Sequence, residues 1–292
     1  MIKVIASDMD GTLLGEDHKL APRTAEAIRR ACRAGIRFIV ATGRDFKEAV
    51  QELDETGITC DYILLSGAEV RNPQQQIVNT LQIDMELCRK TYDMLKEYPV
   101  SVTFMTGQFD YSIGNPEKLE EDLLQSLQEY FHGMDPTEIM KTEMYRSIRK
   151  NSRRVRDFQE LDEKNVPVYK IYVFGKEPEQ LQKIEMRLEK NRRLVAASSA
   201  ADNLEITDVR AQKGPVLKAY IESLGYTMDE VMVFGDSMND YSMLSMDFGA
   251  TIAMGNSGPE IIAAAKYLTK SNEEYGVAYA VEEMLKYNPA KQ

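Results

Sequence analysis

Asp8-Met9-Asp10-Gly11-Thr12 directly follows the apolar run Val4-Ile5-Ala6, which places two acidic side chains at the end of a predicted buried strand. Burying a carboxylate costs free energy unless a cation, a hydrogen-bond donor or a reaction compensates for it. Two acids in this position rarely serve stability. The stretch therefore predicts a catalytic site whose chemistry involves a cation.

Short apolar runs alternate with helical patterns beyond this stretch. A helix is expected to start at Pro22 and to end before Gly35, and a second strand over 37–41 ends at Thr42-Gly43-Arg44. A third apolar run over 62–65 follows. This alternation is typical of an α/β fold with a doubly wound parallel sheet, covered by helices on both faces.

The pattern changes near residue 83, where charged helices and alternating strands begin. Helices are predicted over 116–131 and 178–191, with a strand over 168–174 between them. The doubly wound pattern returns with a helix over 215–224 and a strand over 231–234. We therefore expect a core made of residues 1–82 and 197–292, and an inserted α+β domain over 83–196.

The composition excludes several classes of partner. The 292 residues include 36 Lys and Arg against 47 Asp and Glu, a formal charge of −11 that argues against a nucleic-acid surface. There is no charged leader with a long apolar stretch and no apolar segment of 18 residues, so we expect a cytoplasmic protein with no membrane partner. Cys32, Cys60 and Cys88 lie too far apart for a zinc site, and disulfides are not expected. The oligomeric state cannot be read from the sequence.

Polar residues follow several of the predicted core strands. Ligands of open parallel sheets bind beyond the carboxyl ends of the strands, so these residues are expected to converge. Oxygen ligands suit Mg²⁺ better than zinc, and neither histidine lies in these motifs. The sequence thus predicts a phosphate and magnesium site formed by Asp8, Asp10, Thr42, Lys213, Asp236 and Asp240.

Four motifs, taken in order, resemble those of the haloacid dehalogenase-like phosphatases. They are DMDGT, ATGR, the pair Lys213-Gly214 and GDSMND. The insert resembles the large α+β cap of the Cof-type branch, as do Ile252-Ala253-Met254-Gly255-Asn256 and Ser271-Asn272. Two stretches depart from that branch: Ser66-Gly67-Ala68 stands where Asn-Gly-Ala is common, and Arg210-Ala211-Gln212 precedes Lys213.

The resemblance implies roles for individual residues. Asp8 would be the nucleophile that forms an aspartyl-phosphate, and Asp10 would protonate the leaving group and then activate water. Phosphate would be held by the Met9 and Gly43 amides, the Thr42 hydroxyl, Lys213 and Asn239. Magnesium would be bound by Asp8, the Asp10 backbone carbonyl and Asp236, with Asp240 orienting Lys213 or a metal-bound water from outside. Gly11 and Thr12 would shape the loop.

Each residue also has a structural interpretation. Asp240 could be a helix cap, Thr42-Gly43 a plain turn, Lys213 a solvated charge and Asn239 a turn residue. His18 is interpreted as a loop residue. The basic residues of the insert form either a solvated face paired with acids or a surface that attracts an anionic substrate; they are Arg146, Arg149, Lys150, Arg153, Arg154 and Arg156.

The resemblance implies a Mg²⁺-dependent phosphatase that acts on a small phosphorylated metabolite, such as a sugar phosphate, a nucleotide or a cofactor phosphate. The insert is expected to select the substrate. One alternative is a phosphomutase that uses the same phosphoaspartate. Another is a phosphate-sensing module that is phosphorylated on aspartate, which Asp10 disfavours because it supplies a base for rapid hydrolysis.

Overall fold

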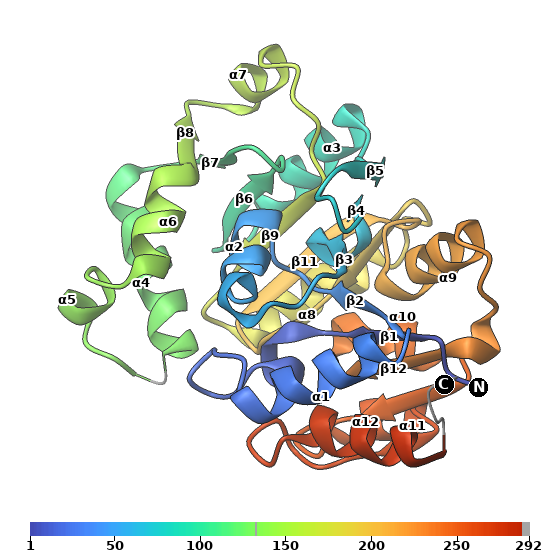
Figure 1. Cartoon of the computed structure of the whole chain (residues 1–292). Coiled ribbons are helices and arrows are strands. Elements are labelled where there is room, and N and C mark those ends of the chain that lie inside the picture. Colours follow the sequence, from blue (N-terminus) through green and yellow to red (C-terminus); the bar gives the residue numbers. More distant parts are fainter. Residues whose placement is uncertain (132, 288–292) are drawn as a thin grey trace. The chain divides into compact units, whose positions relative to one another are not determined.

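The chain forms two compact units in the computed structural model, which describes residues 1–131 and 133–287 (Figure 1). The first unit combines Met1–Leu81 with Arg210–Gln292, and the second is Gln82–Val209. The core is therefore assembled from both ends of the chain, with one continuous insertion between them.

The first unit is built on an eight-stranded sheet. The strands from β14 to β3 are parallel, whereas β4 and β5 continue the sheet in antiparallel fashion. The order across the sheet is β14 (Tyr267–Leu268), β13 (Ala250–Ala253), β12 (Val231–Gly235), β1 (Val4–Ser7), β2 (Arg37–Ala41), β3 (Asp61–Leu64), β4 (Glu69–Arg71) and β5 (Ile77–Thr80).

Strand β1 lies in the interior of this sheet, where Val4 pairs with Val231 of β12 on one side and Arg37 of β2 on the other. All four residues of β1 are buried. A strand that is covered on both faces has to be apolar without alternation, and this explains why the run Val4-Ile5-Ala6 is continuous.

Helices cover both faces of the sheet. On one face, Val4 and Ala6 share a core with residues of α9 and α10. On the other face, α1 and α12 pack against each other (Figure 1). The helices of this unit are α1 (Pro22–Arg33), α2 (Phe46–Gln51), α9 (Lys213–Ser223), α10 (Tyr241–Leu244), α11 (Pro259–Ala264) and α12 (Gly276–Tyr287).

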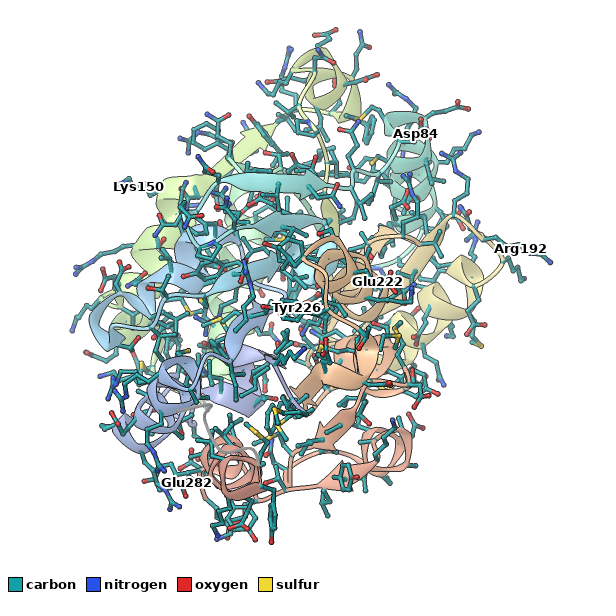
Figure 2. The ribbon with its side chains drawn as sticks, turned by 45° about the vertical axis from the view of Figure 1, so that its right-hand side comes forward. Asp84, Lys150, Arg192, Glu222, Tyr226 and Glu282 are labelled. Atoms are coloured by element: carbon teal, nitrogen blue, oxygen red, sulfur yellow. The ribbon has the colours of Figure 1, made fainter. Side chains whose placement is uncertain are left out.

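The second unit is an α+β domain with a six-stranded sheet of its own. Only β7 and β8 run parallel to each other; the other neighbours are antiparallel. The order is β10 (Leu194–Ala197), β11 (Asn203–Asp208), β9 (Lys170–Phe174), β6 (Ser101–Met105), β7 (Asp110–Ile113) and β8 (Ser152–Val155). Its helices are α3 (Met85–Leu95), α4 (Pro116–Tyr130), α5 (Pro136–Ile139), α6 (Glu143–Asn151), α7 (Phe158–Glu163) and α8 (Pro178–Leu188). Asp84, labelled in Figure 2, caps α3 by accepting a hydrogen bond from the Leu87 amide.

The predicted α/β fold class is confirmed, but the second domain boundary is not where the sequence placed it. Residues 197–209 belong to the inserted unit and not to the core. The reason is strand pairing: β11 lies between β9 and β10, and its Leu204 and Ile206 enter the apolar core of the insert.

The end of the third core strand also differs from the prediction. β3 stops at Leu64, because Leu65 and Ser66 have φ angles of 51° and 60°. In this conformation the Ser66 amide donates to the Thr42 carbonyl at 3.0 Å, and the Leu65 amide donates to the Arg44 carbonyl at 3.0 Å. The strained turn therefore ties the end of β3 to the end of β2.

The basic residues of the insert are engaged locally. Arg149 Nη1 lies 3.2 Å from Glu120, and Arg156 donates to Glu160 at 2.9 Å. The Arg153 guanidinium lies over the Phe109 ring, 4.0 Å from its centroid. Lys150 lies on α6 and is labelled in Figure 2. These contacts favour a solvated face paired with acids.

The described residues 1–131 and 133–287 include no helix that is long and apolar enough to cross a membrane. Cys32, Cys60 and Cys88 are free thiols. The cytoplasmic location and the absence of nucleic-acid and membrane partners stay predictions from the sequence.

Candidate active site

Three neighbouring strands bring the predicted residues to one edge of the sheet. Asp8 follows β1, Thr42 follows β2 and Asp236 follows β12. The Asp8 amide donates to the Phe234 carbonyl of β12 at 3.1 Å, so the strand pairing reaches as far as the first acid. Because β1 lies between the other two strands, the three side chains converge.

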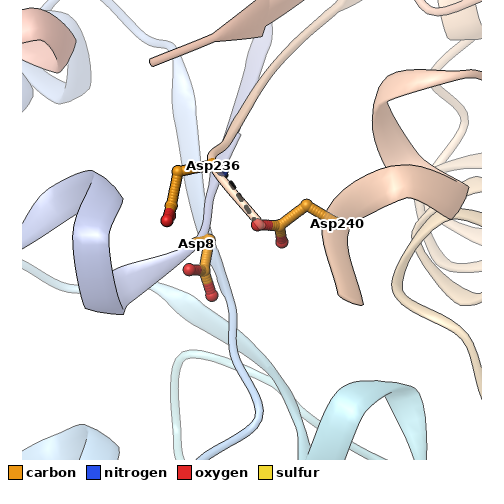
Figure 3. Close-up of side chains that lie close together, drawn as sticks. All are labelled: Asp8, Asp236 and Asp240. Atoms are coloured by element: carbon orange, nitrogen blue, oxygen red, sulfur yellow. Dashed lines mark hydrogen bonds between the residues drawn. The ribbon is translucent and has the colours of Figure 1, made fainter. Parts of the chain in front are cut away.

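Asp8, Asp236 and Asp240 form an acidic cluster (Figure 3). One carboxylate oxygen from each can be chosen such that all three lie within 4.8 Å of one another. A hard divalent cation such as Mg²⁺ prefers oxygen ligands of this kind. The donor set therefore fits a divalent metal.

Lys213, the first residue of α9, supplies the positive charge inside this cluster. Its side chain is 0% exposed, and its Nζ donates to Asp8 Oδ1 at 2.6 Å and to Asp240 Oδ1 at 2.7 Å. The interpretation of Lys213 as a solvated charge is thus wrong. One buried ammonium pairs with more than one carboxylate, so negative charge is in excess at this site. Such an excess favours the binding of a further cation.

The ionisation of the cluster reflects burial and crowding. Burial and the charge of Asp240 raise the pKa of Asp8 well above its usual range, although Lys213 acts in the opposite direction. Burial, followed by the charge of Asp240, raises the pKa of Asp236 to about 7. Burial alone would lower the pKa of Lys213, but Asp240 and Asp8 outweigh it and raise that pKa, so the ammonium is retained.

Asp240 is both a cap and a partner of the lysine. Its Oδ2 accepts hydrogen bonds from the Asp236 amide at 3.0 Å and from the Ser237 amide at 3.2 Å, while Oδ1 accepts from Lys213. The dashed line in Figure 3 marks the first of these bonds. With both oxygens engaged, Asp240 orients its neighbours, which supports its predicted place outside the direct ligands.

The loop after Asp8 is shaped around Asp236. This loop, η1 (Met9–Leu13), is a wide turn that the Leu14 amide closes on the Met9 carbonyl at 2.9 Å. Gly11 has a φ of 72°, and a Cβ placed on it would lie 2.4 Å from Asp236 Oδ2. Thr12 Oγ1 donates to Asp236 Oδ1 at 2.6 Å. Gly11 therefore lets the loop approach the carboxylate that Thr12 then holds.

The Asp10 side chain points to a different set of partners. Arg44 binds it through both oxygens, with Nε at 2.8 Å from Oδ2 and Nη2 at 2.6 Å from Oδ1. His18 Nδ1 lies 3.8 Å from Oδ1. Although desolvation would raise the pKa of Asp10, His18 and Arg44 outweigh it and hold that pKa well below its usual range. The side chain is not part of the acidic cluster, and metal binding through the Asp10 backbone carbonyl stays a prediction.

The predicted phosphate-binding residues lie around the same strand ends. Thr42 is buried, and its Oγ1 accepts from the Arg44 amide at 3.2 Å, so its own proton can be donated to another oxygen. Asn239 Oδ1 accepts from Lys213 at 3.3 Å and from Ser237 Oγ at 2.8 Å, which leaves the amide nitrogen as its donor. Met9 and Gly43 lie in the turns after β1 and β2. Their contacts with phosphate stay predictions.

Sequence reasoning missed three contributors. Arg44 was part of the quoted ATGR motif but had no assigned role, Thr12 was expected only to shape its loop, and His18 was interpreted as a loop residue. Arg44 had a readable signal, because it follows the second strand at the same edge as Thr42. His18 had none, since its approach to Asp10 depends on how the loop between η1 and α1 folds back.

Comparison with known proteins gives one family. Residues 5–281 match the family described as haloacid dehalogenase-like hydrolase. The chain is 29% identical to the phosphatase YwpJ of Bacillus subtilis, over 97% of this chain and all of that protein. It is 25% identical to the 5-amino-6-(5-phospho-D-ribitylamino)uracil phosphatase YwtE of the same organism, over 97% of this chain and 98% of that one.

A solved structure agrees with this assignment. A haloacid dehalogenase-like hydrolase from B. subtilis superimposes with a TM-score of 0.85 at 29% identity, covering 97% of this chain and 100% of the other. The resemblance inferred from the motifs is confirmed. The chain therefore belongs to the haloacid dehalogenase-like hydrolases and is a Cof-type phosphatase of that family.

Proposed function

We propose that this phosphatase is Mg²⁺-dependent and hydrolyses a small phosphorylated metabolite through an aspartyl-phosphate on Asp8. The observation that carries the proposal is the buried Lys213 ammonium, 2.6 Å from Asp8 and 2.7 Å from Asp240, beside a third carboxylate on Asp236. A protein gains little stability from such a crowded, charge-imbalanced cluster, so a catalytic role is favoured.

In the first step Asp8 would attack phosphorus. Lys213 holds Oδ1, so we assign the attack to Oδ2. The new Oδ2–P bond forms as the bond from phosphorus to the leaving oxygen breaks, and Asp10 gives its proton to that oxygen. Lys213, the Thr42 hydroxyl and the Asn239 amide would hold the phosphoryl oxygens as their charge redistributes.

In the second step Asp10 would take a proton from water while the water oxygen attacks phosphorus, which releases Asp8 and inorganic phosphate. Arg44 lowers the pKa of Asp10 and thereby keeps it ionised, as this step requires, although the lower pKa also makes Asp10 a weaker base. The first step needs the protonated form. A phosphate dianion close to Asp10 favours that form, since like charges raise the pKa of a carboxyl group.

Asp8 and Asp236 would hold Mg²⁺ together with the Asp10 carbonyl, and Asp240 would fix the surrounding groups. When bound, the metal would supply positive charge that shields the phosphoryl oxygens from the nucleophile. The protein prepares this arrangement through Thr12, which holds Asp236, and through Lys213, which holds Asp8.

We assign substrate selection to the second unit. Within it, Lys170 of β9 and Glu205 of β11 form a buried ion pair at 3.3 Å, and Ser199 Oγ donates to Glu205 at 3.0 Å. Buried ion pairs contribute little to stability, so these residues are candidates for binding a polar group of the substrate within this unit. The relative YwtE is a 5-amino-6-(5-phospho-D-ribitylamino)uracil phosphatase, which supports a small phosphorylated metabolite as the substrate. Sugar phosphates, nucleotides and cofactor phosphates are the classes to test.

The test is a panel of phosphate monoesters assayed for released phosphate with Mg²⁺, with EDTA, and with Mg²⁺ restored. Asp8→Asn is expected to abolish turnover while the protein stays folded. Asp247→Asn is the control, because that side chain is 92% exposed in the same unit. Turnover by Asp8→Asn close to that of the control would disprove the nucleophile assignment.

Product analysis separates the alternatives. Free phosphate from a monoester supports hydrolysis, whereas an isomer that forms only with a bisphosphate activator would show a phosphomutase. A stable phosphoprotein without turnover on the whole panel would show a phosphate-sensing module.

A further inference from the structure

Two loops near the C-terminal end of the first unit are joined to each other. The Gly255 amide of the first loop donates to the Lys270 carbonyl of the second at 3.0 Å, and the second loop is closed by the Gly276 amide, which donates to the Ser271 carbonyl at 2.9 Å. A Cβ on Gly255 would lie 2.7 Å from the Ser271 nitrogen, so the loops approach as closely as their backbones allow. They form a rigid base for the side chains of Asn256 and Asn272.

Asn256 connects this base to the loop after Asp8. Its Nδ2 donates to the Gly11 carbonyl at 2.8 Å, and its Oδ1 accepts from the Asn272 amide at 3.1 Å. Asn272 adds a second connection, since its Nδ2 donates to the Leu14 carbonyl at 3.0 Å. The wide turn η1 is thus held on both sides of Thr12.

The two hydrogen bonds to the turn, one at Gly11 and one at Leu14, have different effects on the site. Leu14 lies beyond the turn, whereas the Gly11 carbonyl belongs to the peptide unit that also contains the Thr12 nitrogen. Turning that peptide changes the backbone conformation at Thr12 and so moves its hydroxyl, which donates to Asp236 Oδ1 at 2.6 Å. A side chain that fixes the Gly11 carbonyl therefore also fixes the carboxylate.

We infer that Asn256 is a positioning residue of the metal site, which acts through the Gly11–Thr12 peptide on Asp236. The inference rests on the proposed function, because it takes Asp236 to be a metal ligand. Outer groups that orient a ligand commonly change metal affinity by about 10- to 100-fold when they are removed. Asn256 is exposed and is connected to Asp236 through two successive hydrogen bonds, so we expect a loss of metal affinity at the lower end of this range, about tenfold.

The experiment measures binding of Mn²⁺, as a spectroscopic substitute for Mg²⁺, from the electron paramagnetic resonance signal of the unbound ion. Asn256→Ala and Thr12→Val should each weaken Mn²⁺ binding about tenfold, and the double variant should be no weaker than either alone. The Mg²⁺ concentration for half-maximal phosphatase activity should rise in parallel, and for Asn256→Ala the kcat at saturating Mg²⁺ should change less than about threefold.

Asn72→Ala is the matched control. Asn72 Oδ1 also accepts from backbone amides, those of Gln74 at 3.1 Å and Gln76 at 2.9 Å, but in the turn between β4 and β5. This variant should bind Mn²⁺ as the unaltered protein does. Asn272→Ala keeps the backbone bond to Asn256 and should weaken Mn²⁺ binding less than Asn256→Ala.

Three results would overturn the inference: Mn²⁺ affinity of Asn256→Ala within twofold of the unaltered protein, additive losses in the double variant, or a larger loss in Asn272→Ala than in Asn256→Ala. Failure of the unaltered protein to bind Mn²⁺ would instead contradict the proposed metal site itself. The two failures are therefore distinguishable.

Discussion

Replacing Lys213 by Met would remove the ammonium that pairs with Asp8 and Asp240 in the acidic cluster. The methionine side chain is of similar length and can fill the same buried space. The carboxylates of Asp8 and Asp240 would lose a partner at 2.6 and 2.7 Å, with Asp236 close by. We expect a large loss of stability in the metal-free protein and a collapse of turnover.

The size of the loss follows from burial. Removing one partner of a buried ion pair costs about 3–5 kcal/mol, because a charge is left without compensation. A Coulomb estimate agrees, since unit charges about 4 Å apart interact by about 4 kcal/mol at an effective dielectric constant of about 20. At low pH a carboxylate can take up a proton, so the loss of stability is smaller. The free energy of unfolding should therefore fall by about 3–5 kcal/mol at pH 8, and by clearly less at pH 5, where Asp8, whose pKa is raised, can become neutral.

The assay is urea unfolding in EDTA at both pH values, followed by far- and near-ultraviolet circular dichroism. Lys218→Met is the control, because Lys218 lies on the same helix α9 and pairs with Glu222 at 2.7 Å, with the two side chains 42% and 48% exposed. Glu222 is labelled in Figure 2. Exposed pairs of this kind contribute little. If the free energy of unfolding of Lys213→Met fell by less than about 1 kcal/mol at pH 8, the reasoning would be refuted, because removing one partner of a buried ion pair costs more than this.

Three further predictions concern neighbouring groups. The pKa of Asp236 is raised to about 7 in the folded protein, above the value of about 3.9 in the unfolded chain. This group therefore stabilises the metal-free protein fully below pH 4, and the stabilisation is lost as the pH rises to about 7. Urea unfolding between pH 4 and 8 should show the free energy of unfolding falling over this range, and Asp236→Asn should make it depend less on pH. Arg44→Met removes the guanidinium that lowers the pKa of Asp10, so the half-maximal pH for hydrolysis of the phosphoenzyme should move upward. Quenched-flow measurements with a labelled monoester would show this shift, and an unchanged pH midpoint would contradict the role of Arg44. Gly11→Ala should lower Mg²⁺ affinity or turnover by about 10- to 100-fold, because its Cβ would displace Asp236. The control is Gly35→Ala: Gly35 has a φ of 83° and its added Cβ would meet no atom within 4 Å, so this variant should lose only about 1–2 kcal/mol of stability and keep its kinetics unchanged. Equal kinetics for the two variants would contradict the role of Gly11.

The position of the site could be predicted because the same residues encode the strands and their ends. Val4-Ile5-Ala6 is apolar without interruption, since β1 is covered on both faces, and the first acid follows where the covered strand stops. The same holds for β12 and Asp236. The sequence pattern thus located the edge of the sheet where the acids gather.

The domain boundary was missed although a signal existed. Asn203-Leu204-Glu205-Ile206-Thr207 alternates between polar and apolar residues, which is typical of an antiparallel strand and not of the continuous apolar strands of the core. The alternation assigns this stretch to the antiparallel sheet of the insert, where β11 lies. The pairing of Arg44 with Asp10 had no comparable signal, because the direction of a long side chain at a loop depends on packing between distant segments.

The charges of the site have a consequence for how its ligands bind. Asp10 and Arg44 neutralise each other, whereas the three carboxylates of Asp8, Asp236 and Asp240 together with Lys213 carry a formal charge of −2 when all are ionised. A phosphate dianion approaching this site alone is repelled, and a divalent cation brings this charge to zero. Each of the two ligands must then raise the affinity for the other by the same factor, because coupling between binding sites is reciprocal. On the proposed mechanism, the affinity of this phosphatase for its substrate would therefore depend in part on the concentration of free divalent cation.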